Sequence, residues 1–238
     1  MNLTSVIKAA AKTIPFGEKA IEFVSERKYH RIASKTGSFS QHGEDLFIRD
    51  YFAGKKELGN YIDVGAGHPF IINNTYLLYT LGWRGITVEP IPRLFEKHRR
   101  YRAEDIQLQC GVADSNSVLP FFEMVPHVLS TCDTEEADRL IGSKMAVLLR
   151  KRWICVVTLA EICNKYLPSR QLDLLSIDTE GLELQVLQGL DWNAIQPQLV
   201  VCEFSTPTHA SEGLTEFLIN KGYRQLKVLG CNSIWGKS

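Results

Sequence analysis

Four acidic residues stand at or near the ends of short apolar runs of the chain, and their side chains are the ones most suited to chemistry. They are Asp63, Glu89, Asp178 and Glu203. A carboxylate can accept a hydrogen bond from a hydroxyl, remove its proton, or coordinate a divalent cation. The first acid precedes the turn Gly65-Ala66-Gly67-His68, and glycine lets the backbone approach a ligand closely. These residue types indicate a polar-ligand site at the ends of strands.

The glycine-rich turn matches part of a dinucleotide-binding fingerprint. Position 70 is Phe where the G-x-G-x-x-G pattern requires a third glycine, and this weakens the case for a bound pyrophosphate. Glu89 lies 24 residues after Gly65, a separation typical of the acid that accepts from ribose hydroxyls. We therefore predict that Glu89 binds the ribose of an adenosine cofactor. The simpler interpretation is a helix-capping acid before Pro90 and Pro92.

The acids at positions 178 and 203 are predicted to meet. Asp178-Thr-Glu180-Gly follows the run 172–177 and opens a helix, while Glu203 ends the run 199–202. If these runs are neighbouring strands, their ends lie about 5 Å apart. Asp178 and Glu203 could share a divalent ion such as Mg²⁺ or Mn²⁺, or one could act as a general base while the other orients a hydroxyl. For Glu180 the alternative is a first-turn acid that stabilises its helix dipole.

Other candidate residues give weaker signals. His68 could be a catalytic base or could simply bind backbone, and the basic cluster at 97–102 is most simply a solvated helix face. No G-x-S-x-G, Walker A or H-E-x-x-H motif occurs, so a serine hydrolase, a P-loop nucleotidase and a zincin have no support. The six cysteines lack zinc-binding spacing, and we expect reduced thiols in a cytoplasmic protein.

The elements that must position these residues alternate between strand and helix from residue 60 onward. Strands are expected at 61–64, 85–88, 106–110, 172–177, 199–202, 223–229 and 233–235. Helices are expected at 75–81, 93–102, 159–167, 182–190 and 213–221. This pattern predicts a doubly wound α/β sheet that binds its ligand at the carboxyl ends of the strands. The segment 115–157 interrupts the alternation, with strands expected at 119–124 and 153–157 and a polar helix at 135–150.

The charge balance separates a basic N-terminal extension from the rest of the chain. The chain carries 27 basic and 27 acidic residues, and this neutrality argues against a nucleic-acid partner. Residues 1–38 hold an excess of basic side chains in a helical, amphipathic pattern that Pro15 interrupts, and 35–38 is expected to be a linker to a domain at 39–238. Such a helix could contact an anionic membrane or a lipid-linked glycan. The simpler interpretation is a lid or a dimerisation arm, so whether the protein forms a homo-oligomer is left open.

Several motifs resemble those of the FkbM-like methyltransferase family in order and spacing. They are Ser40-Gln-His-Gly-Glu-Asp45, Tyr61-Ile-Asp-Val-Gly-Ala66 with Pro69, Asn74-Thr-Tyr-Leu-Leu-Tyr79, Gly82-Trp-Arg-Gly-Ile86 with Val88-Glu-Pro90, and Leu175-Ser-Ile-Asp-Thr-Glu-Gly-Leu-Glu183 followed by Val186-Leu187 and by Pro197 leading to Glu203. The resemblance covers about residues 39–205. One departure is Asn73, where the family more often has serine.

This resemblance implies a class I S-adenosylmethionine-dependent methyltransferase fold and O-methyl transfer to a hydroxyl of a sugar, glycan or secondary metabolite. The fold has a seven-stranded mixed sheet, with strand four beside strand one, strand five beside strand four, and an antiparallel last strand. The residues that would contact the methionine end of the cofactor are Asp63, Gly65, Ala66, Gly67 and Asp178. Glu89 would hold the ribose, and the adenine would be flanked by Gly111, Val112 and Asp114. Gln41 and Glu44 would close the cavity, and the substrate would meet Asn74, Thr75 and Glu180.

Our hypothesis for the reaction is that Asp178 activates the acceptor hydroxyl, directly or through a divalent ion shared with Glu203. Two other classes of function stay open at this point. One is a nicotinamide-dependent oxidoreductase on the same sheet topology, and the other is a non-catalytic cofactor-binding module that interacts through its basic N-terminal helix. We expect the protein in the cytoplasm, where the basic extension could bring it to the inner face of a membrane.

Overall fold

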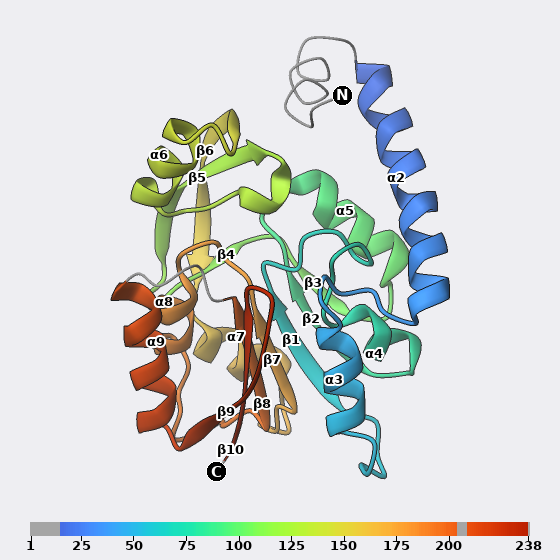
Figure 1. Ribbon diagram of the computed structural model, residues 1–238. Helices are drawn as coiled ribbons and strands as arrows, with labels where there is room; N and C mark the ends of the chain where they lie inside the picture. Colours follow the sequence, from blue (N-terminus) through green and yellow to red (C-terminus); the bar gives the residue numbers. More distant parts are fainter. Residues whose placement is uncertain (1–14, 204–208, 238) are drawn as a thin grey trace.

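The main sheet contains seven strands in the computed structural model, which describes residues 15–203 and 209–237 of the chain. Figure 1 shows this sheet in the centre of the molecule with helices packed around it. The strand order is β3-β2-β1-β7-β8-β10-β9. The strands are β1 (Asn60–Val64), β2 (Arg84–Val88), β3 (Ile106–Leu108), β7 (Leu174–Ile177), β8 (Leu199–Glu203), β9 (Tyr223–Leu229) and β10 (Asn232–Lys237).

The pairing of these strands confirms the predicted fold class. β1 runs parallel to β2 and β7, with Asp63 opposite both Thr87 and Ser176, and β7 runs parallel to β8. β10, the last strand, is antiparallel to both β8 and β9. This is the order expected from the resemblance. Because β1 and β7 lie at the centre and are covered on both faces, their residues are buried nearly throughout.

Helices cover both faces of the sheet, as a doubly wound fold requires. On one face, Leu159, Val186 and Leu218 pack into a large apolar core from the helices α7 (Leu159–Tyr166), α8 (Glu183–Gln188) and α9 (His209–Asn220). On the other face, Ile48 and Leu78 pack into a second core from α3 (Glu44–Tyr51) and α4 (Tyr76–Thr80). Each predicted helix of the alternating region is present with its ends shifted by a few residues, whereas α3 was not predicted.

The segment that interrupts the alternation forms a second sheet. Within the described residues it has the order β4-β6-β5, with β4 (Gly111–Val112), β5 (Ser117–Val125) and β6 (Val147–Val157). The predicted polar helix is wrong beyond Gly142, where α6 (Thr134–Gly142) ends. Residues 147–150 belong to β6 and pair antiparallel with β5. The backbone ladder with β5, together with the run Val147-Leu148-Leu149, outweighs the helical propensity of the flanking polar residues.

The N-terminal extension contains the helix α2 (Pro15–Thr36), which runs along one side of the molecule in Figure 1. Proline suits the first position of this helix, because its missing N–H would have no partner there. Lys35 and Thr36 belong to the helix and not to the predicted linker. The part of the predicted extension at 1–14 lies outside the described residues. Across the residues that the structure describes, no helix is both long enough and apolar enough to cross a membrane.

Candidate functional site

A cavity of about 930 Å³, part of it open to solvent, lies at the carboxyl ends of β1, β2 and β7. This is the edge of the sheet where doubly wound folds bind ligands. One wall comes from the glycine-rich turn and the tip of β2. The opposite wall comes from the second sheet, and the tip of β7 contributes Asp178 and Glu180. The predicted strand ends therefore do form one site.

The glycine-rich turn brings β1 into close contact with the tip of β7. Gly65 has a φ of 72°, and a Cβ atom placed on it would lie 1.7 Å from the carbonyl oxygen of Asp178. No side chain fits in that space, so the residue must be glycine. The next glycine, Gly67, donates its backbone N–H to the Glu89 carboxylate at 2.8 Å. The turn therefore fixes the positions of two of the acids at once.

Glu89 faces the cavity while it binds the backbone on either side. Its other carboxylate oxygen accepts the N–H of Ile91 at 2.7 Å, so part of the helix-capping interpretation is correct. The side chain is buried, and this burial raises the pKa of the Glu89 carboxyl to about 8, although the two backbone N–H groups oppose the rise. A ligand that offers hydroxyl donors at this point would stabilise the charged carboxylate.

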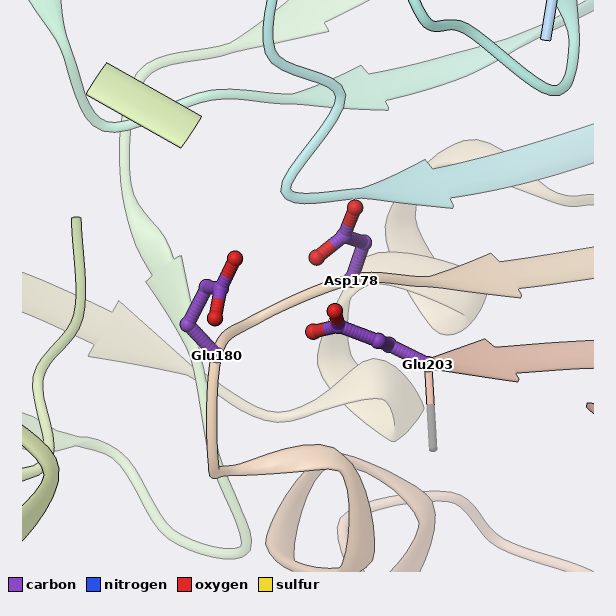
Figure 2. Close-up of side chains that lie close together, drawn as sticks. All are labelled: Asp178, Glu180 and Glu203. Atoms are coloured by element: carbon purple, nitrogen blue, oxygen red, sulfur yellow. The ribbon is translucent and has the colours of Figure 1, made fainter. Parts of the chain in front are cut away.

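Three carboxyl groups converge beside this turn. Figure 2 shows Asp178 and Glu180 on the loop after β7 and Glu203 at the tip of β8, with their oxygens directed toward one another. One oxygen atom from each group lies within 4.8 Å of the others. Among the described residues, no group forms a hydrogen bond to the buried Oε2 of Glu203. The arrangement concentrates negative charge at one point of the cavity.

Burial and mutual repulsion raise the pKa values of all three acids. Asp178 is exposed to the cavity, but protein atoms surround its carboxyl group. This burial, followed by the charge of Glu203, holds the pKa of Asp178 well above the usual range. Burial and then the charge of Asp178 raise the pKa of Glu180 to about 9. Burial and then neighbouring acids raise the pKa of Glu203 to about 8. A cation bound beside the three groups would lower these pKa values and favour the carboxylate forms.

The loop after β7 is shaped to present Glu180. Its φ is 54°, an uncommon conformation for a residue other than glycine, and the loop is held by Glu183, which accepts hydrogen bonds from the backbone N–H groups of Thr179 and Gly181. α8 begins at Glu183, so this residue is the first-turn acid and Glu180 lies before the helix. The hydroxyl of Thr131, on the segment between β5 and α6, donates to the Glu180 carbonyl at 2.8 Å. A strained residue supported from several sides is typical of functional sites.

Comparison with known proteins identifies the family. The family described as the methyltransferase FkbM domain matches residues 63–225. The chain belongs to the FkbM methyltransferase family. It is therefore an S-adenosylmethionine-dependent methyltransferase, as the resemblance implied, and the oxidoreductase alternative is set aside. No curated protein matches the chain significantly.

Two solved methyltransferase structures resemble this FkbM protein at low identity. One is a TehB-like S-adenosylmethionine-dependent methyltransferase from Corynebacterium glutamicum, with 12% identity and a TM-score of 0.44 over 91% of this chain and 97% of that chain. The other is the 1,6-didemethyltoxoflavin-N1-methyltransferase of Burkholderia thailandensis, solved with 1,6-didemethyltoxoflavin and S-adenosylhomocysteine. It has 12% identity and a TM-score of 0.42 over 95% of this chain and 91% of that chain.

In this FkbM methyltransferase Asp63 lies beneath the cavity, outside its lining. Its carboxylate accepts from the Thr75 hydroxyl at 2.6 Å and from the Asn73 amide at 3.2 Å, and it lies 3.7 Å from the Arg102 guanidinium. The Asn73 side chain also accepts the N–H groups of Thr75 and Tyr76, and this gives it a role in starting α4. Asp63 thus supports the floor of the site through a buried network.

Arg102 corrects the prediction that the basic cluster at 97–102 is a solvated helix face. Its side chain is fully buried and pairs with Asp105 at 2.8 Å. His98, one turn earlier on α5 (Pro92–Tyr101), is also fully buried, and its Nε2 lies 3.0 Å from the carbonyl oxygen of Gly67. Burial lowers the pKa of His98 to about 3, so the ring is neutral and donates from Nε2. The inner side of this helix therefore supports the glycine-rich turn.

The other predicted cofactor and substrate residues divide between the cavity and its surroundings. Ala66, Gly111 and Val112 line the cavity. Those outside its lining are Gln41, Glu44, Asn74, Thr75, Asp114 and Glu203. Asp114 is exposed and accepts from the Ser115 hydroxyl, while Glu44 is buried and accepts from the Asn232 amide at 2.8 Å. Asn74 donates to the hydroxyl of Ser176, a residue of β7, at 3.4 Å.

One part of the cavity wall was missed by sequence reasoning. His127, Ser130 and Cys132 line the wall from the segment between β5 and α6, where the interrupted alternation was the one signal of an added element. His68 lines the cavity as predicted, but its ring is buried and its Nε2 lies 3.1 Å from Glu26 of α2. This contact favours a role in holding the wall, whereas the sequence left His68 open as a catalytic base or as a residue that binds backbone.

Proposed function

We propose that the protein transfers the methyl group of S-adenosylmethionine to a hydroxyl oxygen of a sugar, a glycan or a related secondary metabolite. The observation that carries this proposal is the convergence of Asp178, Glu180 and Glu203 beside the cavity. A hydroxyl is a weak nucleophile until its proton is removed, and a carboxylate with a raised pKa is a suitable acceptor for that proton. Methylation of a more nucleophilic nitrogen or sulfur atom would not need such a cluster.

The residues around the cavity suit the cofactor. Bound S-adenosylmethionine supplies a methyl group on a positively charged sulfonium. We place the ribose hydroxyls at Glu89 and the adenine beside Gly111 and Val112. The methionine end would lie along the backbone of the glycine-rich turn. The raised pKa of Glu89 supports this placement, because hydroxyl donors would satisfy a carboxylate that burial otherwise disfavours. The acids at 178 and 180 favour a cation nearby.

Asp178 is the residue that we assign as the base. It is open to the cavity, and burial followed by the charge of Glu203 holds its pKa high. The proton leaves the acceptor hydroxyl for the Asp178 carboxylate while the oxygen attacks the methyl carbon. Positioning of the two reacting atoms in line supplies a large part of the rate. Glu180, on its strained loop, is placed to accept a hydrogen bond from a second hydroxyl of the acceptor.

Three carboxylates at this spacing also suit Mg²⁺ or Mn²⁺, which prefer oxygen ligands. Such an ion would be held by Asp178, Glu180 and Glu203, and would lower the pKa of a bound hydroxyl. Calorimetry with MnCl₂ alone would detect the ion, and Glu203→Gln would weaken its binding. Activity unchanged by EDTA would assign the acids to proton transfer without a metal.

The decisive experiment compares Asp178→Asn with Asp138→Asn, which changes an exposed acid on α6. Each variant is incubated with S-adenosylmethionine and a panel of sugars and glycans, and mass spectrometry detects methylated products. Asp178→Asn should lose turnover while calorimetry still shows S-adenosylhomocysteine binding. Undiminished activity of Asp178→Asn would refute the assignment. Cofactor binding without any methylated product from the unaltered protein would favour the non-catalytic module.

A membrane or a lipid-linked glycan is the partner that we propose for α2. Lys28, Arg31 and Lys35 are exposed on this helix, so they can contact anionic headgroups. Co-sedimentation with phosphatidylglycerol vesicles should decrease when these residues are changed together to glutamate. Equal sedimentation of the two proteins would remove the proposal.

A further inference from the structure

The C-terminal half of α2 packs against the loop that forms one wall of the cavity. This loop runs from His68 to Ile72, and both of these residues line the cavity. Ala33, on the inner side of α2, is buried, and the ring of His30 lies 4.5 Å from the ring of Phe70. The helix therefore contacts the cavity wall from behind.

Polar contacts fix the helix to both ends of this loop. At one end, Glu26 Oε1 lies 3.1 Å from His68 Nε2 and 2.5 Å from Lys97 Nζ, and Lys97 lies 3.3 Å from the same His68 nitrogen. At the other end, the Tyr29 hydroxyl accepts the backbone N–H of Ile72 at 3.0 Å. These contacts join the N-terminal extension to residues far away in the sequence.

Burial makes the contact at Glu26 significant. The side chain of His68 is 3% exposed, that of Glu26 15% and that of Lys97 18%. Partly desolvated ion pairs of this kind hold their geometry more firmly than surface pairs, which are screened by solvent. Lys97 lies on α5, the helix that also supports Gly67 through His98. Glu26 thus joins α2, α5 and the cavity wall at one point.

We propose that α2 is a structural part of the cofactor cavity and that Glu26 is a positioning residue, which acts by holding His68 against the cavity. This inference rests on the proposed binding of S-adenosylmethionine there. In this arrangement α2 packs on one side of the cavity wall and the cofactor packs on the other side. Each of them therefore favours the binding of the other. By linkage, cofactor binding must then stabilise the docking of α2 to the same extent that docking improves cofactor affinity.

The test measures S-adenosylhomocysteine binding by calorimetry for the unaltered protein, Glu26→Gln, Glu26→Asp and Ile32→Ala. Glu26→Gln removes the charge and should raise Kd about tenfold, which corresponds to about 1.4 kcal/mol. Glu26→Asp should recover part of the affinity, because the carboxylate is retained. Ile32→Ala changes an exposed residue six positions further along the same helix and should leave Kd unchanged.

Hydrogen exchange separates positioning from general destabilisation. In the unaltered protein, S-adenosylhomocysteine should slow amide exchange across residues 26–36 of α2, and in Glu26→Gln this slowing should be lost. Tight binding by the unaltered protein with an equal Kd for Glu26→Gln would overturn the inference and leave the proposed function intact. No binding by the unaltered protein would count against the cofactor cavity itself and therefore against both.

Discussion

Replacing Gly65 by alanine tests whether the close approach of β1 to β7 holds the site together. The new Cβ would lie 1.7 Å from the Asp178 carbonyl oxygen, so the two backbones must separate by more than an ångström. Crowding of this kind costs about 1–3 kcal/mol. The φ of 72° adds about 1–2 kcal/mol for a residue with a side chain. We expect Gly65→Ala to lower the free energy of unfolding by about 2–5 kcal/mol.

Gly67→Ala is the matched control for this prediction. Its φ is 57°, but the nearest atom to its added Cβ is the Gly65 carbonyl oxygen at 3.9 Å, an ordinary contact. Only the cost of the positive φ applies, so the free energy of unfolding should decrease by about 1–2 kcal/mol. Urea titrations of both variants, followed by circular dichroism, measure the difference. If the two variants lose the same stability, crowding against Asp178 does not constrain the turn and our explanation of Gly65 is wrong.

Three further predictions concern the groups around the cavity. Arg102→Met leaves two buried carboxylates without their cation and should lower the free energy of unfolding by about 3–5 kcal/mol, measured by urea titration; a loss below about 1 kcal/mol would contradict the buried network. The folded-state pKa of Glu203 is about 8 against an ordinary 4.5, so the native state retains a proton that the unfolded chain loses. Stability should therefore fall as pH rises from about 4.5 to about 8, and Glu203→Gln should show a shallower fall in Tm across this range, whereas identical slopes would exclude Glu203 as a source. His98→Phe leaves the Gly67 carbonyl without its donor and should weaken S-adenosylhomocysteine binding about tenfold, and unchanged affinity in calorimetry would show that the turn holds without it.

The strand ends were predictable from the sequence because local patterns determine them. Short apolar runs that stop at an acid mark both a buried strand and its tip, and parallel neighbours bring such tips to one edge. This is why the sequence alone predicts Glu89 and Asp178 at the carboxyl ends of strands. The motifs around them then gave the strand order, which periodicity alone does not supply.

Contacts between distant parts of the chain were not predictable. Nothing near His68 in the sequence indicates that Glu26 lies against its ring, and nothing in the basic cluster indicates that Arg102 is buried against acids. Burial of a charge depends on partners from other elements, which a local pattern does not record. The same applies to residues 147–150, whose strand conformation depends on pairing with β5.

The order of the strands also governs when the site can exist during folding. Asn60, at the start of β1, donates to Asp173, which is 113 residues further along the chain. Closing so long a loop is entropically costly, and non-local pairing of this kind is slow. β5 and β6 are consecutive strands and can pair earlier. The cavity, however, lacks its opposite wall until β1 pairs with β7. Because the cavity needs both walls, S-adenosylhomocysteine binding would report that β1 and β7 have paired.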